Sequence, residues 1–268
     1  MSRSGLLDAT LKSLSRALSH ALISEHTARQ PGVMQALDPR VRLIGVLALV
    51  IAIALIHKIA IVLALFAGAV VLALLSAITL RTLTLRVWLV VLAFTGVIAL
   101  PALFLTPGDP LSVASPITRQ GLHTALMLIA RVEAAATLTT TLVLTTPWPQ
   151  VLKALRSLYV PKEVVMMLTM AHRYIFLLAE TAVQMFESRE SRRVGILRGR
   201  EQRRLVAQTA GVLMSKSIDL SQEVFVAMLS RGYRGDVQVL SERRMMLHDE
   251  LALGVFVAVA VLSIWVGR

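Results

Sequence analysis

Five long runs of apolar residues constrain this chain more than any other feature of its sequence. They lie at residues 43–56, 59–80, 87–105, 122–146 and 251–266. A helix needs about 20 mostly apolar residues to cross the hydrocarbon core of a bilayer. Only helices and closed barrels can span it, because backbone polar groups find no water there. We therefore expect an all-α, polytopic membrane protein with five transmembrane helices and its two ends on opposite sides of the membrane.

Short breaks separate these runs. His57-Lys58 separates the first apolar run from the second, which predicts a helical hairpin with a minimal turn. Pro101 predicts a kink in the third span, because proline removes a backbone hydrogen bond inside a helix. Proline and glycine at 106–116 predict a loop, and the fourth span ends at Pro147.

Composition excludes several classes of protein. Of the 268 residues, 56% are hydrophobic and only 16% are charged, yet the formal net charge is +12. Soluble domains average about 25% charged residues, so an ordinary cytosolic enzyme, a disordered tail and a collagen-like fibre are excluded. The long apolar spans also argue against nucleic acid as a partner, and the positive charge instead fits anionic lipid or acidic partners. The chain has no cysteine, so it forms neither disulfides nor thiolate metal sites.

The charged residues are concentrated in two segments. Residues 1–40 have apolar residues at helical spacing, which predicts an amphipathic segment that lies in the headgroup region or packs on the protein's own surface. Residues 41–147 would then hold the first four spans and 251–268 the fifth. The block between them, 148–250, carries 16 Lys and Arg and 11 Asp and Glu and predicts three or four amphipathic helices.

The distribution of positive charge predicts the orientation. If the N-terminus is cytoplasmic, 24 of the 28 Lys and Arg lie on the cytoplasmic side and three on the other, with Arg131 inside the fourth span. Cytoplasmic segments of membrane proteins carry an excess of Lys and Arg. We therefore expect the N-terminus and the 148–250 block inside and the C-terminus outside.

The sequence lacks the motifs of nucleotide and catalytic chemistry. It has neither a G-x-x-x-x-G-K-[ST] loop nor a G-x-G-x-x-G fingerprint after a strand, so ATP-driven work would need the ATPase of another polypeptide. Its six histidines have no metal-ligand spacing, and no nucleophile elbow occurs. We expect a non-catalytic chain that binds no cofactor or metal itself, and we interpret His172 as a packing or capping residue.

Arg131 and Glu133 are ionisable residues well inside a predicted span. Charge within a membrane is a functional candidate by default. The two side chains are about 200° apart around the helix and cannot pair with each other. Each therefore needs a partner on another helix, a water-lined groove or the interface. A structural role is one interpretation, and an ion pathway is the other.

Two arginine-containing stretches, 187–193 and 229–235, end predicted helices of the 148–250 block. In the second, the apolar face ends in Arg231 and then Gly232, which is typical of a helix C-terminus. An arginine there either caps its own helix or offers its planar guanidinium to an acidic groove in a partner.

Four motifs follow one another along the chain. They are Leu37-Asp38-Pro39-Arg40-Val41-Arg42-Leu43, then Thr145-Thr146-Pro147-Trp148 with 152–161, then Arg173-Tyr174-Ile175-Phe176-Leu177-Leu178, and then Ser230-Arg231-Gly232-Tyr233. In this order on a five-span plan, they resemble the transmembrane T component of energy-coupling factor (ECF) transporters, most closely its cobalt-type branch. The resemblance covers about residues 36–268. Its signature residues here are Asp38, Pro39, Arg40, Pro147, Pro161 and Arg173.

The resemblance implies a mechanism. A T component is the static coupler of a vitamin- or metal-uptake ABC importer, and its cytoplasmic coupling helices sit in grooves of a pair of ATPase subunits. On this interpretation the 148–250 block is the coupling-helix domain. A second partner, a membrane substrate-binding subunit, reorients in the bilayer as ATP binding shifts the coupling helices.

In this family, two short small-Arg-Gly motifs at helix ends contact the ATPases. Ser230-Arg231-Gly232 matches the second motif. The first would fall at Ser188-Arg189-Glu190, where a glutamate replaces the usual small residue. Because of this departure, Arg192 or Arg193 is a further candidate for the role of Arg189.

The resemblance also implies the remaining partners and the location. ATP and Mg²⁺ would be bound by the two ATPase subunits, and the transported metal by the membrane partner. The protein would lie in the bacterial inner membrane. Cobalt is the first expectation for the solute, followed by nickel or biotin. The alternatives from other classes are an ion-coupled secondary transporter that uses Arg131 and Glu133, a membrane-embedded enzyme, and a membrane-anchored interaction protein unrelated to transport.

Overall fold

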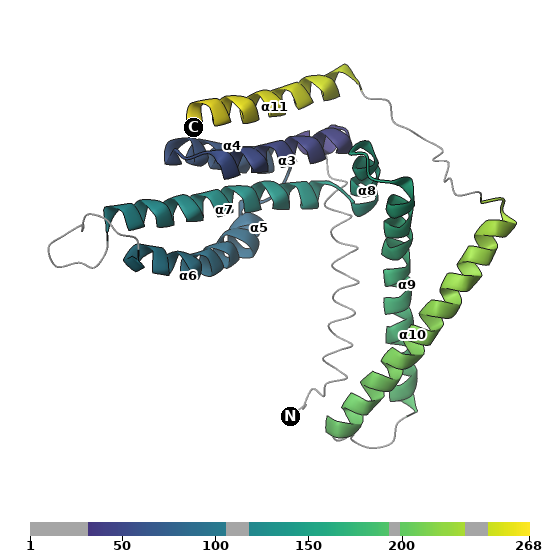
Figure 1. The fold of residues 1–268 in the computed structure, drawn as a ribbon. Coiled ribbons are helices and arrows are strands. Elements are labelled where there is room, and N and C mark those ends of the chain that lie inside the picture. Colours follow the sequence, from purple (N-terminus) through teal and green to yellow (C-terminus); the bar gives the residue numbers. More distant parts are fainter. Residues whose placement is uncertain (1–31, 106–117, 193–198, 234–245) are drawn as a thin grey trace. The chain divides into compact units, whose positions relative to one another are not determined.

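The computed structural model of the chain describes residues 32–105, 118–192, 199–233 and 246–268. Helices are the regular structure throughout these ranges, so the all-α expectation is confirmed for them (Figure 1). The described chain divides into two compact units, one up to Ala154 together with 246–268, and one from Leu155 to 233. The amphipathic segment predicted within 1–40 lies almost entirely outside the described residues, as does the loop at 106–116.

The first unit contains most of the apolar helices. They are α2 (Val33–Ala36), α3 (Pro39–Leu55), α4 (Ile59–Leu75), α5 (Leu80–Leu83), α6 (Leu89–Leu105), α7 (Arg119–Thr145) and α11 (Leu247–Gly267). A single π-helical turn, Thr84–Trp88, joins α5 to α6. α6 includes Pro101 and continues beyond it.

Three of the described helices are long and apolar enough to cross a membrane, namely α7, α11 and, in the second unit, α9 (Lys162–Ser191). α4 and α6 are apolar but shorter. α3 and α4 have 17 residues each, or roughly 25 Å at 1.5 Å per residue, which is less than the hydrocarbon core of about 30 Å.

α4 ends at Leu75, before the predicted boundary at residue 80. The backbone turns at Ala77, whose φ of 60° is left-handed, and the Ser76 hydroxyl donates to the Leu72 carbonyl at 2.7 Å. The apolar run continues through Ile78 into α5, which is why hydropathy alone extends the span too far.

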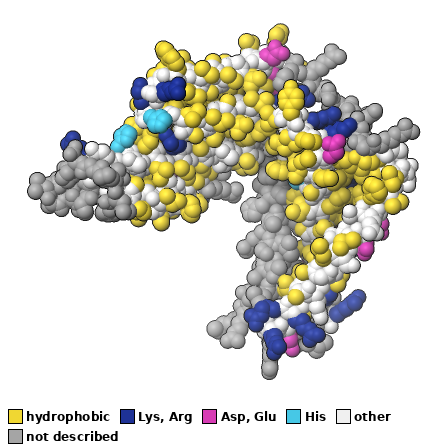
Figure 2. All heavy atoms as spheres, in the orientation of Figure 1, with side chains coloured by type: hydrophobic (Ala, Val, Ile, Leu, Met, Phe, Trp, Pro, Cys, Tyr) yellow, Lys and Arg dark blue, Asp and Glu magenta, His cyan; other side chains and the backbone are white. Residues whose placement is uncertain are grey.

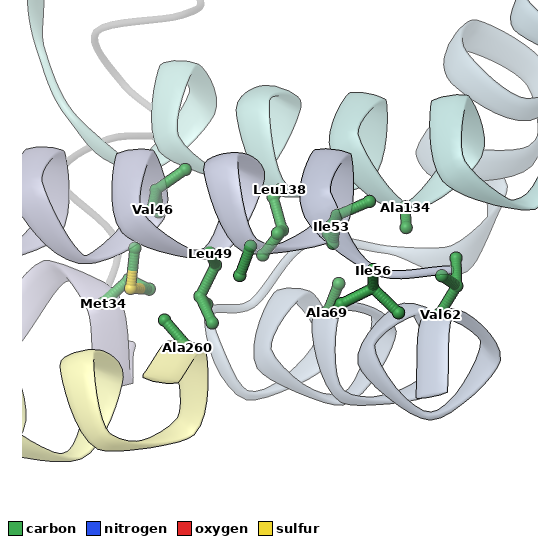
Figure 3. Packing of buried hydrophobic residues seen from close by; sticks show 11 residues of the cluster. Met34, Val46, Leu49, Ile53, Ile56, Val62, Ala69, Ala134, Leu138 and Ala260 are labelled. Carbon is green, nitrogen blue, oxygen red and sulfur yellow. The ribbon is translucent and has the colours of Figure 1, made fainter. Parts of the chain in front are cut away.

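α7 is the centre of the first unit and packs against α3, α4 and α6, while α11 packs against α3 (Figure 1). The buried cluster combines side chains of α2, α3, α4, α7 and α11 (Figure 3). Its members are Met34, Val46, Leu49, Ala52, Ile53, Ile56, Val62, Ala69, Ala134, Leu138 and Ala260.

Two glycines allow α3 and α11 to approach closely. A Cβ atom at Gly45 would lie 2.7 Å from the ring of Phe256, and one at Gly267 would lie 2.8 Å from Cγ2 of Ile56. Helices in lipid associate through van der Waals packing, which small residues improve by bringing backbones together. The first contact is near the beginning of α3 and the second is near its end, so the two helices run parallel along their whole length.

The second unit is built from α9 and α10 (Gly199–Ser230), and α8 (Trp148–Ser157) leads into it. α8 buries Leu152 and Ala154. Breaks follow α8 at Pro161 and α10 at Gly232, where the sequence predicts them.

We predict that Gly45→Leu destabilises the protein by about 1–3 kcal/mol, because overpacking at this position would push Phe256 and α11 away from α3. Thermal unfolding of the detergent-purified protein, followed by fluorescence-detected size exclusion, measures the effect. Gly68→Leu in α4 is the matched control, since nothing lies within 4 Å of a Cβ atom there. Equal melting temperatures of the two variants would contradict this packing.

Candidate functional site

The second arginine motif ends α10 in a Schellman motif. Gly232 has a φ of +80°, a left-handed conformation that glycine adopts without strain. Its N–H donates to the Leu229 carbonyl at 2.9 Å, and the N–H of Tyr233 donates to the Met228 carbonyl at 3.0 Å. These two bonds satisfy carbonyls that a helix end leaves open. Arg231 is therefore the C-cap residue of α10, and its side chain is exposed.

The neighbours of Arg231 are held by contacts within the hairpin. The Tyr233 hydroxyl donates to Sδ of Met166, in the first turns of α9, at 3.0 Å. The Ser230 hydroxyl donates back to the Val226 carbonyl at 3.0 Å. The Arg231 guanidinium has no hydrogen bond or ion pair with the described part of the chain. It is thus available to a partner on a fixed helix end.

The first arginine motif lies on the last turns of α9. Arg189 is half-buried, and its Nη1 points to the Leu205 carbonyl of α10 at 3.4 Å, a long hydrogen bond. Ser188 is exposed, and Arg192 is the exposed C-cap residue of α9. Arg193 lies outside the described residues. Within this motif, Arg189 therefore joins the two helices, whereas Arg192 is open to a partner.

The two motifs lie at opposite ends of an antiparallel helix pair. One end is defined by the contact of Arg189 with Leu205, and the other by that of Tyr233 with Met166. Ser230 follows Leu205 by 25 positions, which is about 37 Å along a helix at 1.5 Å per residue. Arginines this far apart suit contact with two separate molecules.

Much of the apolar surface of this hairpin is uncovered (Figure 2). Ala182, Phe186 and Thr209 are its buried residues. The exposed large apolar side chains are Val164, Met167, Leu168, Ile175, Leu177, Val212, Met214, Ile218, Phe225, Val226 and Leu229. Apolar exposure of this extent marks a surface for protein or membrane contact.

The first signature motif begins α3 and joins it to α11. Oδ1 of Asp38 accepts the N–H of Arg40 at 2.9 Å, an N-cap bond, and Pro39 occupies the first helical position. The N–H of Asp38 donates to Oδ1 of Asp249 at 2.9 Å. Asp249 is fully buried at the beginning of α11 and also accepts the N–H of Met246. One carboxylate thus holds the first turns of both helices.

Arg42 lies in the first signature motif, but no role was predicted for its side chain. It is 3% exposed. Its guanidinium donates to the carbonyls of Thr145 at 2.8 Å, Gln35 at 2.7 Å and Leu37 at 2.6 and 2.9 Å. Thr145 ends α7, so the cation satisfies a carbonyl at the negative end of that helix. The sequence feature that could have revealed this role is a second arginine, two residues after Arg40, at the beginning of an otherwise apolar helix.

The remaining signature residues mark helix boundaries. The Pro147 carbonyl accepts the N–H groups of Gln150 and Val151 and begins α8. Pro161 is the N-cap residue of α9. Arg173 is exposed on α9.

The neighbouring His172 stacks edge-on against Phe176 with ring centroids 5.0 Å apart, in agreement with a packing role. Among the described residues, no group of three His, Asp or Glu is arranged to hold a metal ion.

Arg131 finds a partner on another helix. Its Nη2 donates to the Ile56 carbonyl at the end of α3, at 2.6 Å. Lys58 makes the equivalent contact at the end of α11, where its Nζ donates to the Val266 carbonyl at 2.7 Å. Both cations therefore cap helix C-termini, which agrees with the structural interpretation of Arg131.

Glu133 lies on a buried polar stripe of α7 with Thr137, Thr141 and Thr145. Each threonine hydroxyl donates to the carbonyl four residues before it, and Nε1 of Trp88 donates to the Thr137 hydroxyl at 3.1 Å. Glu133 is 7% exposed, and neither carboxyl oxygen has a hydrogen-bond partner in the part of the chain that the structure describes. Arg131 and Glu133 do not bind each other in the structure, because Arg131 donates to the Ile56 carbonyl and the Glu133 oxygens have no partner among the described residues.

Apolar helices of membrane-crossing length and a hairpin with uncovered apolar surface define a helical membrane protein built to contact other molecules. Comparison with known proteins identifies the family. A family model described as cobalt transport protein, CbiQ, matches residues 32–241. The chain therefore belongs to the CbiQ family, the cobalt-type branch of ECF T components, and the resemblance found in the sequence is confirmed. Proteins of this family are membrane components of ABC-type transporter complexes and are generally non-catalytic.

Individual relatives agree with this assignment. An uncharacterised protein of Methanocaldococcus jannaschii is 30% identical over 251 residues, which cover 91% of this chain and 86% of that protein. The cobalt transport protein CbiQ of Rhodobacter capsulatus is 28% identical over 156 residues, 56% of this chain and 64% of its own. The nickel permease LarQ of Lactiplantibacillus plantarum is 31% identical over 168 residues, 63% of this chain and 58% of its own.

We predict that Arg42→Ala sharply reduces the amount of folded protein in the membrane. It would leave three carbonyls without their donor, and each buried unsatisfied group costs about 1–3 kcal/mol. Membrane-fraction yield and size-exclusion profile measure the loss. Arg40→Ala is the matched control on the same helix, because its side chain has no bond among the described residues. An equal yield of both variants would remove the role of Arg42.

We predict that Glu133→Gln leaves folding intact, because a neutral side chain of the same shape suits a buried position that offers no partner to a charge. Glu133→Lys should abolish accumulation in the membrane, since the longer cation would be buried unpaired. Thermal stability in detergent and membrane yield distinguish the variants. A Gln variant as damaged as the Lys variant would mean that the carboxyl group itself is required.

Proposed function

We propose that this chain is the transmembrane coupling component of an ATP-driven cobalt importer. The α9–α10 hairpin would bind two ATPase subunits through its arginine-ended helices and transmit their motion to a membrane substrate-binding subunit. One observation carries this proposal: Arg231 and Arg192 are exposed C-cap residues, at opposite ends of an antiparallel helix pair whose apolar surface is largely uncovered. Residues 148–250 would be the coupling-helix domain.

A five-span topology of α3, α4, α6, α7 and α11 is supported by contacts at both ends of the bundle. The beginnings of α3 and α11 meet through Asp38 and Asp249, and Arg42 brings the end of α7 to the same level. The other ends of α3 and α11 meet where the N–H of His57 donates to the Gly267 carbonyl at 3.0 Å. α3 and α11 therefore run in one direction and α7 in the opposite one, as expected if they are the first, fifth and fourth of five spans. Together with the positive charge of 1–42 and 148–250, this arrangement supports a cytoplasmic N-terminus and an external C-terminus in the cell membrane.

Cobalt is the proposed solute because the matching family model and the Rhodobacter relative are both described as cobalt transport proteins. Nickel is the next candidate, since another relative is named a nickel permease. The metal is cargo of the assembly, and we assign it to the membrane partner. ATP and Mg²⁺ would be bound by the ATPase subunits.

Substitution of the exposed C-cap arginine tests this proposal. Arg231→Ala should raise the Kd of the purified chain for its ATPase subunits about thirtyfold or more, which corresponds to about 2 kcal/mol for a desolvated arginine pair. Comparing Arg192→Ala with Arg189→Ala in the same binding measurement shows which of the two arginines of the first motif contacts the ATPase. If Arg192 makes the contact, its variant should bind more weakly than the Arg189 variant.

Lys216→Ala is the control, because Lys216 is an exposed cation in the middle of α10 without a partner among the described residues. Metal uptake by cells that express each variant with its partners gives a second measurement. Full ATPase binding and uptake with Arg231→Ala would overturn the proposed role of the hairpin.

A further inference from the structure

The first turns of α10 carry three arginines on one side of the helix. Arg200, Arg203 and Arg204, here called the arginine face, are all exposed, and spacings of three and four residues bring side chains together on a helix. None of their guanidinium groups has a hydrogen bond or ion pair within the described ranges. Figure 2 shows Lys and Arg side chains gathered over this end of α10.

This arrangement is unfavourable for the chain alone. Like charges three and four residues apart destabilise a helix, and cations are disfavoured at the positive, N-terminal end of its dipole. The acid of the first turn, Glu201, lies three residues before Arg204, so it offsets part of the charge of the three arginines and leaves a net positive side. Local conflicts of this kind are expected where a residue serves function rather than folding. The arginine face therefore calls for an anionic partner.

The arginine face adjoins the first arginine motif. Arg189 of α9 contacts the carbonyl of Leu205, the residue that follows Arg204. Arg192 is exposed at the end of α9. Residues 189–204 contain seven arginines, two glutamates and no lysine. A partner that binds the end of α9 thus meets the arginine face as part of one surface.

The composition of this surface favours a protein over a lipid headgroup. Ala207, Gln208 and Gly211 continue the same side of α10 and are exposed, so no large apolar side chain accompanies the arginines there. A helix that lies in a membrane interface buries the side opposite its basic residues in the lipid. In this part of α10 that side is already occupied, because Thr209 is buried there and the Leu205 carbonyl is contacted by α9. The rigid fork of arginine matches carboxylates in a bidentate geometry.

We infer that the arginine face binds acidic side chains of the ATPase subunit held at the α9 end of the hairpin and steers that subunit onto it. This inference rests on the proposed function. It adds a second, electrostatic contact at that end, separate from the C-cap arginines.

The test is a titration of the full-length chain, purified in detergent without anionic lipid, with separately purified ABC ATPase subunits. Simultaneous Arg200→Glu, Arg203→Glu and Arg204→Glu substitution should raise the Kd about tenfold or more at roughly 0.15 M salt, with a smaller ratio at about 0.5 M because salt screens exposed charges. Glutamate at a helix N-terminus favours the helix, so unfolding of α10 does not explain such a loss.

Single substitutions provide the matched control. Arg203→Glu and Lys216→Glu change the net charge equally on the same helix, and Lys216 is about 160° around the helix from Arg200. Arg203→Glu should weaken binding measurably, whereas Lys216→Glu should leave the Kd within about twofold of wild type, as expected for a remote surface charge. If the two substitutions raise the Kd equally, the arginines act only through the net charge of the chain, and the inference is overturned.

The outcomes separate this inference from the function on which it rests. If the wild-type chain does not bind the ATPases, or Arg231→Ala has no effect, the proposed function fails. If Arg231→Ala weakens binding and the triple variant does not, only the arginine face fails. A triple variant that binds ATPase normally but retains fewer phosphatidylglycerol molecules in native mass spectrometry would assign the arginine face to the membrane and overturn the inference.

Discussion

The first unit depends on how the ends of its apolar helices are satisfied. A helix leaves several carbonyls and N–H groups without internal partners at each end, and water is scarce around a bundle within lipid. Arg42 donates to the end of α7, and Asp249 accepts from the N–H of Asp38 as well as from that of Met246. These two buried charged side chains serve three helix ends, and the close packing at Gly45 follows from the register that they set.

The second unit follows the opposite principle. Its few internal contacts, such as the bonds of Tyr233 and Arg189, hold the two helices as a hairpin and leave most side chains exposed. In the bundle, Arg42, Asp249 and Arg131 bind the ends of neighbouring helices, whereas the hairpin leaves exposed guanidinium groups and apolar side chains open. This division fits the proposed coupling role, in which the helix pair would exchange contacts with other subunits while the bundle stays fixed in the membrane.

Local patterns predicted much of this architecture. The apolar runs identified α3, α4, α6, α7 and α11, and the Arg-Gly order identified the end of α10, because hydropathy and cap chemistry act over a few residues. The polar contacts of the bundle could not be predicted in this way. Asp38 and Asp249 are 211 residues apart and Arg42 and Thr145 are 103 apart, and no local pattern specifies which helix ends meet. The short length of α4 was also missed, since the turn at Ala77 lies within a continuous apolar run.

Charge within the apolar helices is therefore better understood from the ends of neighbouring helices than from a pathway. Arg131 lies in the middle of α7, yet α3 ends beside it, and its guanidinium meets the Ile56 carbonyl there. α7 has 27 residues and α3 has 17, so a residue central to one helix can lie level with the end of another. A cation in such a place always finds carbonyls to accept its hydrogen bonds. A carboxylate would find no partner in that place, since the free groups at a helix C-terminus are acceptors. Glu133 lies on another side of α7, where the described residues offer its carboxyl oxygens no hydrogen-bond donor.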